Sequence, residues 1–401
     1  MTASYWQRHA GWCDLWQATP LPSRVDVAVI GGGIAGLMTA IRVRERDPGA
    51  TVAVLEAERV GFGASGRSAG FLSPLAAPVW LLGAERSPDK AWAAARINAD
   101  VHAIARWLAA HVPEIELRPV TLRLEAAGRV AAGGLSEMTR AVELVGLAHQ
   151  LSTSRGRLTL SMAAYTLHPY KLVRGLAEHA VRSGVILRER ARVREIDGER
   201  VRFAGGELHA RRIVACTNAY TQSLGIERIR ALVVRSFMTA TAPLDPSLLR
   251  DDDFTVEVNP AQAYHRTHAG RIIYGGIDKL LVRAGDDTAV PDDVRAHLAR
   301  LLAKSVPGAV PGETWAGVFH ATATGLPIIR VSSTNPALVL NVGYGGTGFA
   351  LALACAPLVA EVVTGGQPDR LLSVIRDTRI SARDALRTIG RIAGRLARPG
   401  R

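Results

Sequence analysis

The chain has 401 residues, of which 48% are hydrophobic and 21% charged, and it carries a net charge of +13. This length exceeds the usual limit for one compact core, so we expect two domains, and the composition excludes disorder except at the ends. No run of about 18 apolar residues lacks a charge or a breaker, so the sequence predicts no membrane span.

The cysteines and the N-terminus indicate the compartment. Cys13, Cys216 and Cys355 lie far apart, without C-x-x-C or histidine-paired spacing. This spacing excludes a disulfide framework and a structural zinc site, so we predict no metal. The first residues contain no continuous apolar stretch and are not typical of a secretion signal. These features favour a reducing cytoplasm.

The first sharp pattern is a βαβ unit. Val25–Ile30 is a short run of β-branched and small apolar residues, as in a buried parallel strand. Leu37–Arg46 is predicted as a helix, which Asp47-Pro48-Gly49-Ala50 ends. Thr51–Glu56 is predicted as the next strand. Together these elements complete one unit.

The turn of this unit contains G-x-G-x-x-G. Gly31 permits the tight turn, Gly33 lets the backbone approach a pyrophosphate, and Gly36 lets helix and strand pack closely. Ile34 and Ala35 lie in the first turn of the helix, whose free N–H groups favour phosphate. The spacing therefore predicts a dinucleotide site.

An acidic residue supports this interpretation. Glu56, followed by Ala57, ends the second strand twenty residues after Gly36. A carboxylate at this place can bind both ribose hydroxyls, and it would repel the 2′-phosphate of NADP.

The next ten residues favour FAD over NAD. The segment 61–70, Gly-Phe-Gly-Ala-Ser-Gly-Arg-Ser-Ala-Gly, places small residues where the chain must pass close to something long. We expect a collar around the pyrophosphate and the isoalloxazine ring, with Ala64, Ser65, Arg67 and Ser68 as contacts. A flexible surface loop is the alternative.

Helices and strands alternate through the rest of the chain. The predicted helices are Ala91–His111, Pro169–Ser183, Asp292–Lys304 and Ala350–Thr364. The predicted strands are Val185–Leu187, Val193–Ile196, Arg200–Phe203, Glu207–Ala210, Ile213–Cys216, Ala263–Thr267, Arg271–Gly275 and Ala337–Val342. Val193 and Thr217, near strand ends, are further candidate cofactor contacts.

A third glycine-rich turn opens the last of these helices. It contains Gly343, Gly345, Gly346, Thr347 and Gly348. Unpaired backbone N–H groups at such a turn suit an anion, and the pyrimidine end of a reduced flavin is one. A second nucleotide phosphate site is the alternative.

The C-terminus is basic. Residues 376–401 hold eight arginines against two aspartates, and five arginines recur every four residues from Arg379 to Arg395. This spacing predicts an amphipathic basic helix. A solvated helix on the protein surface is one interpretation, and an anionic partner such as RNA, lipid headgroups or an acidic protein is the other.

Several segments together resemble one family. They are the turn at 31–36, the segment 63–70, Leu167-His168-Pro169, the segment 215–220 and the turn at 343–349. The family is the FAD-dependent amine oxidoreductases typified by D-amino-acid oxidase, glycine oxidase and sarcosine oxidase, and the gamma-glutamylputrescine branch looks nearest. The resemblance covers residues 24–365.

The resemblance and the order of elements together imply the fold class. We expect an α/β fold with an α+β substrate part, in which a discontinuous Rossmann-like FAD-binding domain is interleaved with a mixed-sheet substrate domain. The expected boundaries are 24–85, 150–230 and 328–375 for the FAD-binding domain and 86–149 and 231–327 for the substrate domain, with an N-terminal extension at 1–23 and the basic tail at 376–401.

The chain departs from the family pattern at three positions. Thr324 stands where the family usually has aspartate, and Phe319 stands about where sarcosine oxidases have their flavin-linking cysteine. We therefore predict non-covalent FAD. Ala350 replaces a lysine that binds the carboxylate in sarcosine oxidases, which argues against sarcosine as substrate.

Four residues are candidates for the substrate site. Tyr264 and Arg266 lie two apart on one strand, so they share a face, and Arg266 could bind a substrate carboxylate through two hydrogen bonds. A structural ion pair is the alternative for this arginine. His320 and Tyr344 lie on segments that the resemblance places near the flavin ring, although a lone histidine is more often structural.

The expected reaction is the oxidation of a small amine or amino acid. Hydride transfer to the flavin would give an imine, which water hydrolyses to a carbonyl compound. Molecular oxygen or an electron-transfer partner would reoxidise the cofactor. Two alternatives remain: the oxidation of 2-hydroxy acids or polyol phosphates, and an RNA-associated flavoprotein that modifies an aminomethyl group. The basic residues lack interleaved aromatics, so nucleic acid is the less favoured partner.

Overall fold

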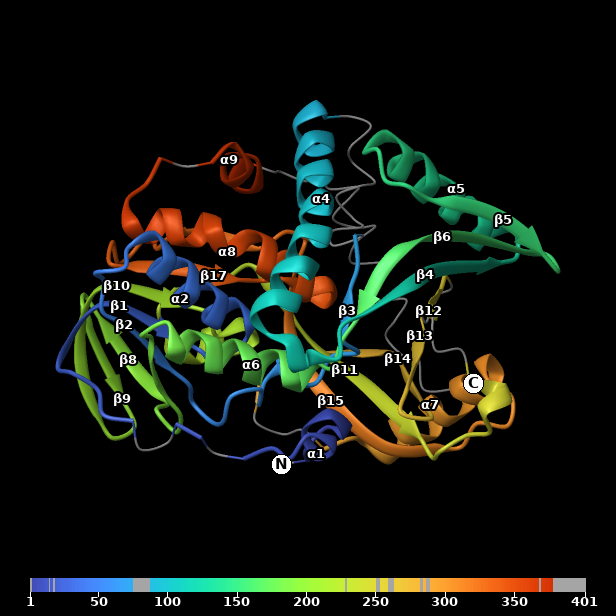
Figure 1. Cartoon of the computed structure of the whole chain (residues 1–401), viewed down its shortest axis with the longest axis horizontal. Coiled ribbons are helices and arrows are strands. Elements are labelled where there is room, and N and C mark those ends of the chain that lie inside the picture. Colours follow the sequence, from blue (N-terminus) through green and yellow to red (C-terminus); the bar gives the residue numbers. More distant parts are fainter. Residues whose placement is uncertain are drawn as a thin grey trace.

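The computed structural model describes residues 2–13, 15–16, 19–74, 87–227, 229–249, 253–258, 263–281, 284–285, 289–367 and 369–377. Within these residues the chain forms two large sheets that lie side by side with helices packed around them (Figure 1). The predicted basic helix falls almost entirely after residue 377 and so lies outside the described residues.

The first sheet, sheet A, has the order β16-β17-β10-β1-β2-β7, with β8 and β9 attached to β10. Its strands β1, β2, β7, β10 and β17 are parallel, and β16 and β9 pair antiparallel at its margins. The strands are β1 Arg24–Ile30, β2 Val52–Leu55, β7 Ile186–Arg188, β8 Val193–Asp197, β9 Arg200–Phe203, β10 Gly206–Ala215, β16 Ile328–Val331 and β17 Leu338–Val342.

The predicted βαβ unit forms as β1, α2 (Ile34–Arg46) and β2. Val27 and Val29 face the core that α2 shares with α6 (Pro169–Arg182) and α8 (Gly348–Thr364). Ala28 and Ile30 face a second core formed with the β8–β9 hairpin. Because both faces of the sheet are covered, the strand is apolar at every position from Val27 to Ile30 rather than alternating. The expected Rossmann-like architecture is confirmed.

Helix α8 lies at the centre of this half. The segment 345–364 is the one described helix that is long and apolar enough to cross a membrane, with a mean hydropathy of 1.8. However, 67% of it is buried inside the protein, where it packs against α2 and α4 (Pro88–His111). The sequence prediction passed over this run because Pro357 and Glu361 interrupt it. Burial in the core accounts for its hydropathy.

The second sheet, sheet B, has the order β15-β11-β14-β13-β12-β4-β6-β3, and β5 pairs with β6. It is mixed, since β12 runs parallel to β4 whereas the other pairs are antiparallel. The strands are β3 Phe71–Leu72, β4 Arg118–Ala127, β5 Gln150–Ser154, β6 Arg157–Thr166, β11 Ala231–Thr241, β12 Asp253–Glu257, β13 Tyr264–His268, β14 Arg271–Leu281 and β15 Pro311–Thr322.

Helix α7 (Asp292–Ser305) covers one face of sheet B, where Leu298 packs against Phe237 and Ala316. The predicted hairpin about residues 268–270 forms between β13 and β14. Ala269 and Gly270 take φ angles of 48° and 72° in its turn, the left-handed region that this tight turn requires.

Three features differ from the sequence expectation. Strand β10 is one continuous strand, where two separate strands were expected. The strands β4, β5 and β6 and the helix α5 (Arg129–Leu144) were not predicted. Strand β5 is exposed at every residue, and two adjacent glycines, Gly133 and Gly134, weaken the helical signal of α5. The residues 150–166, expected in the FAD-binding domain, instead form β5 and β6 and pair within sheet B.

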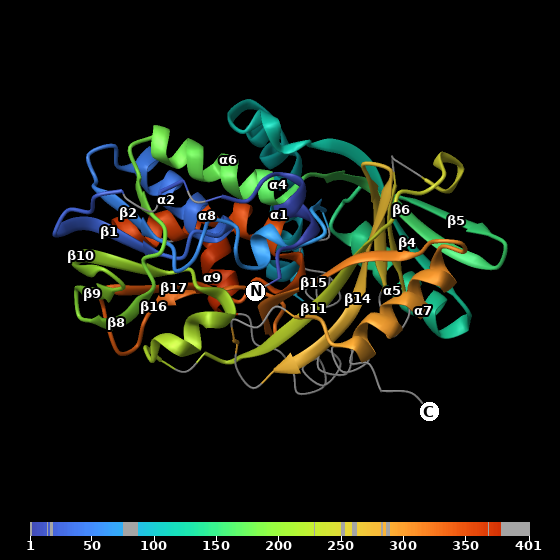
Figure 2. The ribbon, with the colours of Figure 1, turned by 90° about the horizontal axis from the view of Figure 1, so that it is seen from below.

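The N-terminal segment is packed rather than extended. Helix α1 (Tyr5–His9) lies at the boundary between the two halves, below β15 and α6 (Figures 1 and 2). Trp6 is fully buried and Tyr5 is 4% exposed. At the other end of the described chain, α9 (Arg370–Asp377) packs on β16 and α4.

Candidate cofactor and active site

The first glycine turn is shaped by close backbone approach. Gly31 has φ of 108°, and a Cβ built on it would lie 2.8 Å from the carbonyl oxygen of Cys216. A Cβ on Gly36 would lie 1.9 Å from the carbonyl oxygen of Gly31. A side chain at either position would push strand β1, helix α2 or strand β10 out of contact. The turn therefore holds the N-terminus of α2 directly above the end of β1.

Glu56 is held in place beside this turn. Its Oε2 accepts a hydrogen bond from the Gly32 N–H at 2.7 Å, and its Oε1 accepts one from the Glu58 N–H at 2.9 Å. Burial raises the pKa of the Glu56 carboxyl, while the two backbone hydrogen bonds oppose that rise. The side chain lies at the end of β2, where a ribose would bind.

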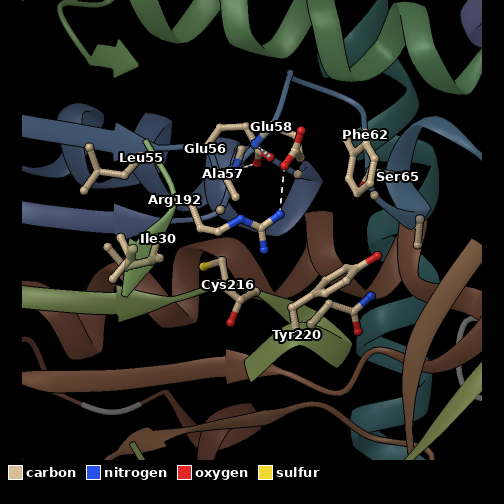
Figure 3. Close-up of a pocket in the computed structure, with 18 of the residues that line it drawn as sticks. Ile30, Leu55, Glu56, Ala57, Glu58, Phe62, Ser65, Arg192, Cys216 and Tyr220 are labelled. Carbon is tan, nitrogen blue, oxygen red and sulfur yellow. Dashed lines mark hydrogen bonds and ion pairs between the residues drawn. The ribbon is translucent and has the colours of Figure 1, made fainter. Parts of the chain in front are cut away.

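The first glycine turn and Glu56 line one groove at the carboxyl edge of sheet A (Figure 3). The groove, counted together with the open solvent at its mouth, has a volume of about 860 Å³. Of the residues predicted from sequence to contact a cofactor, eight line it: Gly31, Gly33, Glu56, Ala57, Ala64, Ser65, Val193 and Thr217.

The sequence missed several groove residues. Arg192 reaches across the groove and pairs with Glu58, with 2.8 Å between Nη2 and Oε1 (Figure 3). Tyr220 and Phe62 lie at the other end, away from Ile30 (Figure 3). Arg192 and Tyr220 could have been found from the sequence. Arg192 directly precedes the predicted strand that begins at Val193, and Tyr220 is the last residue of the segment 215–220 that resembles the family.

The segment 61–70, which we call the strap, is tightly folded against α2. Its Ser65 hydroxyl accepts a hydrogen bond from the Ile34 N–H at 3.2 Å, at the N-terminus of α2. A Cβ on Gly66 would lie 2.1 Å from the Gly61 carbonyl oxygen, and one on Gly70 would lie 2.2 Å from that of Leu167. The small residues are therefore needed for packing. Ser68 bonds within the strap, to the Gly70 N–H.

Arg67 is the charged residue of the strap. It is 3% exposed, and its Nε donates to the Phe62 carbonyl at 2.6 Å. Its Nη1 donates to the carbonyls of Thr2 and Ala316 at 2.9 and 3.3 Å. Burial lowers the pKa of this guanidinium to about 10, so it stays charged at neutral pH. Its Nη2 is buried and has no partner among the described residues.

The third glycine turn, residues 343–348, lies away from the groove and meets sheet B. Gly343 has φ of 86°, and a Cβ on it would lie 2.7 Å from the Thr322 methyl group. A Cβ on Gly346 would lie 3.9 Å from the ring of Phe319. A Cβ built on Gly317, which lies on β15 like Phe319, would lie 3.6 Å from the Cβ of Arg67. The strap and the third turn therefore converge on one face of β15.

Tyr344 does not reach that face. Its hydroxyl donates to the Asn341 side-chain oxygen, and Asn341 donates to Thr39 and Cys216 at 3.1 and 3.3 Å. Burial raises the pKa of the Tyr344 phenol well above 10. The structure thus places this side chain in the core beneath sheet A.

His320 also lies away from the convergence. Side chains alternate along β15, so His320 is on the face opposite Gly317 and Phe319. Its backbone N–H donates to the Asn218 side chain at 2.9 Å, and both ring nitrogens lack a partner among the described residues. Burial lowers its pKa to about 4, so the ring is neutral at pH 7.

Tyr264 and Arg266 share a face of β13, as the spacing predicts, but α1 covers the arginine. The Arg266 guanidinium lies 4.9 Å from the ring centroid of Trp6 and donates to the Gly70 carbonyl at 3.3 Å. Burial lowers its pKa to about 9. Tyr264 packs over Gly275 in the neighbouring strand. The structure does not bring these two residues together with His320 or Tyr344.

The comparisons with known proteins identify the family. The family described as DAO, FAD dependent oxidoreductase, matches residues 26–362. The chain belongs to this family. It is therefore an FAD-dependent oxidoreductase, and the resemblance deduced from its motifs is confirmed.

Individual relatives cover nearly the whole of this FAD-dependent oxidoreductase. A probable oxidoreductase OrdL of Rhizobium meliloti (strain 1021) is 27% identical over 394 residues, 90% of this chain and 88% of that protein. Gamma-glutamylputrescine oxidoreductase of Escherichia coli (strain K12) is 28% identical over 370 residues, 85% of this chain and 84% of that protein. The crystal structure of glycine oxidase from Geobacillus kaustophilus matches with a TM-score of 0.74 and 21% identity, over 90% of this chain and all of that chain.

The geometry of this family member fits FAD. The α2 N-terminus and the Ser65 hydroxyl provide donors for a pyrophosphate, and Glu56 provides the ribose acceptor. The buried Nη2 of Arg67 provides a cationic donor without a protein acceptor among the described residues, at the end of the strap nearest to β15. An unmade hydrogen bond from a buried charge is unfavourable, and an acceptor on the cofactor would relieve it.

Proposed function

We propose that this FAD-dependent oxidoreductase oxidises the carbon–nitrogen bond of a small amine or amino acid. The substrate loses a hydride from the carbon beside nitrogen and a proton from the nitrogen, and water hydrolyses the resulting imine to a carbonyl compound with release of ammonia or an amine. When bound, FAD supplies the acceptor for that hydride. The relative gamma-glutamylputrescine oxidoreductase, whose name describes an amine substrate, supports this proposal.

One observation supports the site of the reaction. The strap and the third glycine turn meet the same face of β15, at Gly317 and Phe319. The register carries this face across β11 and β14, since Gly317 lies opposite Ser236 and Ser236 lies opposite Asp278. We call this face the substrate wall.

The substrate wall has a polar row and an apolar row. The polar row is Gly317, Ser236 and Asp278, and the apolar row is Phe319, Val234 and Leu280. Leu280 is 41% exposed, so part of the apolar row is open to solvent. We infer that the wall orients an amine with an apolar substituent against Phe319 and Leu280, with polar groups toward Ser236 and Asp278.

The chain's own residues then have three tasks. Glu56, Ser65 and the α2 N-terminus fix the cofactor, the apolar row contacts the apolar substituent, and the polar row positions nitrogen. Asp278 is 5% exposed and lies on this wall, so its carboxylate is suited to accept a hydrogen bond from the N–H of a neutral substrate amine. A neutral amine needs no further base, which agrees with the position of His320 on the opposite face.

Two further expectations accompany this proposal. FAD is bound without a covalent link, because Phe319 occupies the wall where a cysteine would be needed. The enzyme acts in a reducing cytoplasm, in keeping with three free cysteines, of which Cys13 is exposed.

The test is anaerobic reduction of the purified holoenzyme. We expect amines or amino acids from a panel of D- and L-amino acids, secondary amines and polyamines to bleach the flavin absorbance. Bleaching by 2-hydroxy acids or polyol phosphates and by none of the amines would overturn the proposal. Admission of air then separates the acceptors: rapid recovery with peroxide indicates an oxidase, and slow recovery indicates a dehydrogenase.

A further inference from the structure

The N-terminal segment is bonded directly to the cofactor strap. Ser4 Oγ donates to the Gly66 carbonyl at 3.0 Å, and Gln7 Nε2 donates to the Gly61 carbonyl at 2.8 Å. The Thr2 carbonyl accepts from Arg67 Nη1 at 2.9 Å. These contacts join residues more than fifty positions apart in the sequence.

The two side chains have a second role in α1. Ser4 Oγ also accepts from the Gln7 N–H at 3.2 Å, and Gln7 Oε1 accepts from the Ser4 N–H at 2.7 Å. This reciprocal pair is a capping box. Both side chains are fully buried. Each side chain therefore both caps α1 and forms a hydrogen bond to the strap.

The other side of α1 is anchored to sheet B. The buried ring of Trp6 lies over the Arg266 guanidinium, 4.9 Å from ring centroid to Cζ. The Tyr5 hydroxyl bonds to His268 Nδ1 at 2.9 Å. A five-residue helix is not stable alone, so this docking is what keeps α1 formed. Helix α1 thus links the strap to the sheet that carries the substrate wall.

We propose that residues 2–12 form a latch that pre-orders the strap for FAD, with Ser4 and Gln7 as positioning residues. Four of the ten strap residues are glycines, whose backbone loses much entropy on ordering. The strap must be ordered wherever it contacts cofactor at Ser65 and Arg67. If the latch forms before FAD binds, the backbone entropy of the strap is lost on folding, and FAD binding no longer has to overcome that loss.

The test uses variants that lose the strap bond but leave α1 with a tolerated N-cap residue. Gln7→Glu keeps the cap acceptor but cannot donate to the Gly61 carbonyl when ionised, and Ser4→Gly keeps a tolerated N-cap residue without the hydroxyl. We expect each to weaken FAD binding to the apoprotein by about 3- to 10-fold, and the pair together by about 10- to 100-fold. Kd is measured by quenching of flavin fluorescence.

Arg8→Ala is the matched control on the same helix, since Arg8 pairs with Glu313 at the surface. It should leave Kd unchanged. Hydrogen exchange of strap amides 62–67 in the apoprotein should rise in Ser4→Gly and Gln7→Glu, and KM for the amine should not change at saturating FAD. If the buried carboxylate of Gln7→Glu prevents folding, Ser4→Gly alone decides the question.

Two results would overturn the latch. One is FAD binding by Ser4→Gly and Gln7→Glu with wild-type affinity. The other is equal weakening by Arg8→Ala, which would show that general docking of α1 matters rather than its bonds to the strap.

Discussion

The close contact at Gly36 allows a quantitative test of the cofactor turn. In Gly36→Ala the new Cβ would lie 1.9 Å from the Gly31 carbonyl oxygen, whereas ordinary contact begins at 3.4 Å. The helix α2 or the turn must therefore move by about 1.5 Å. Helix α2 is packed against α8 and α6 and cannot move freely. We expect a loss of about 3 kcal/mol in the free energy of unfolding, the upper end for overpacking.

The movement would also displace the N–H groups that we propose bind the pyrophosphate. We expect FAD affinity to fall by roughly 100-fold, a loss similar to the one that a misplacement of about 1 Å can cause in a reaction rate. Thermal unfolding of the apoprotein and flavin fluorescence titration measure the two effects. Gly134→Ala in α5 is the control, because nothing lies within 4 Å of its Cβ position. Wild-type stability and affinity in Gly36→Ala would refute the close packing that the structure shows.

Four shorter predictions follow from other residues. Acid precipitation should release all yellow colour into the supernatant, and colour retained in the pellet would contradict non-covalent FAD at Phe319. Asp278→Asn should raise KM for amines by about tenfold or more with little change in FAD affinity, as expected for a lost charged hydrogen bond, and steady-state kinetics checks this. Arg67→Met should weaken FAD binding about tenfold or more, measured by fluorescence titration. The pKa of His320 is lowered to about 4 in the folded protein, so below pH 6.5 the histidine takes up a proton when the protein unfolds. The free energy of unfolding should therefore be highest above pH 6.5 and fall by roughly 2–3 kcal/mol as the pH drops toward 4. Thermal unfolding of His320→Gln should lack this pH dependence.

The cofactor half could be predicted from sequence because its constraints are local. A G-x-G-x-x-G turn between a strand and a helix leaves few conformations, and the approach of Gly36 to Gly31 is set by residues five apart. The same holds for the hairpin at 268–270, where the turn type follows from adjacent residues. Elements with weak local signals were missed, such as the exposed polar strand β5.

The catalytic candidates depended on information that no local pattern contains. His320 and Phe319 are neighbours in sequence, yet they lie on opposite faces of β15, and the approach of the third turn to Phe319 is the reason why we propose the Phe319 face as the substrate wall. The register Gly317–Ser236–Asp278 likewise joins three strands and needs the pairing itself. A single-residue shift in that register would exchange the wall for the opposite face.

Arg266 shows how a correct local deduction can still leave a role undetermined. Its shared face with Tyr264 follows from strand alternation and agrees with the structure. Trp6 covers the guanidinium on that face, and Trp6 belongs to the five-residue helix α1 near the N-terminus. Because Trp6 and the Gly70 carbonyl already contact the guanidinium, this arginine contributes to holding α1 and the strap against sheet B. We therefore propose that substrate orientation depends on the neighbouring substrate wall of β15, β11 and β14, where Leu280 is 41% exposed.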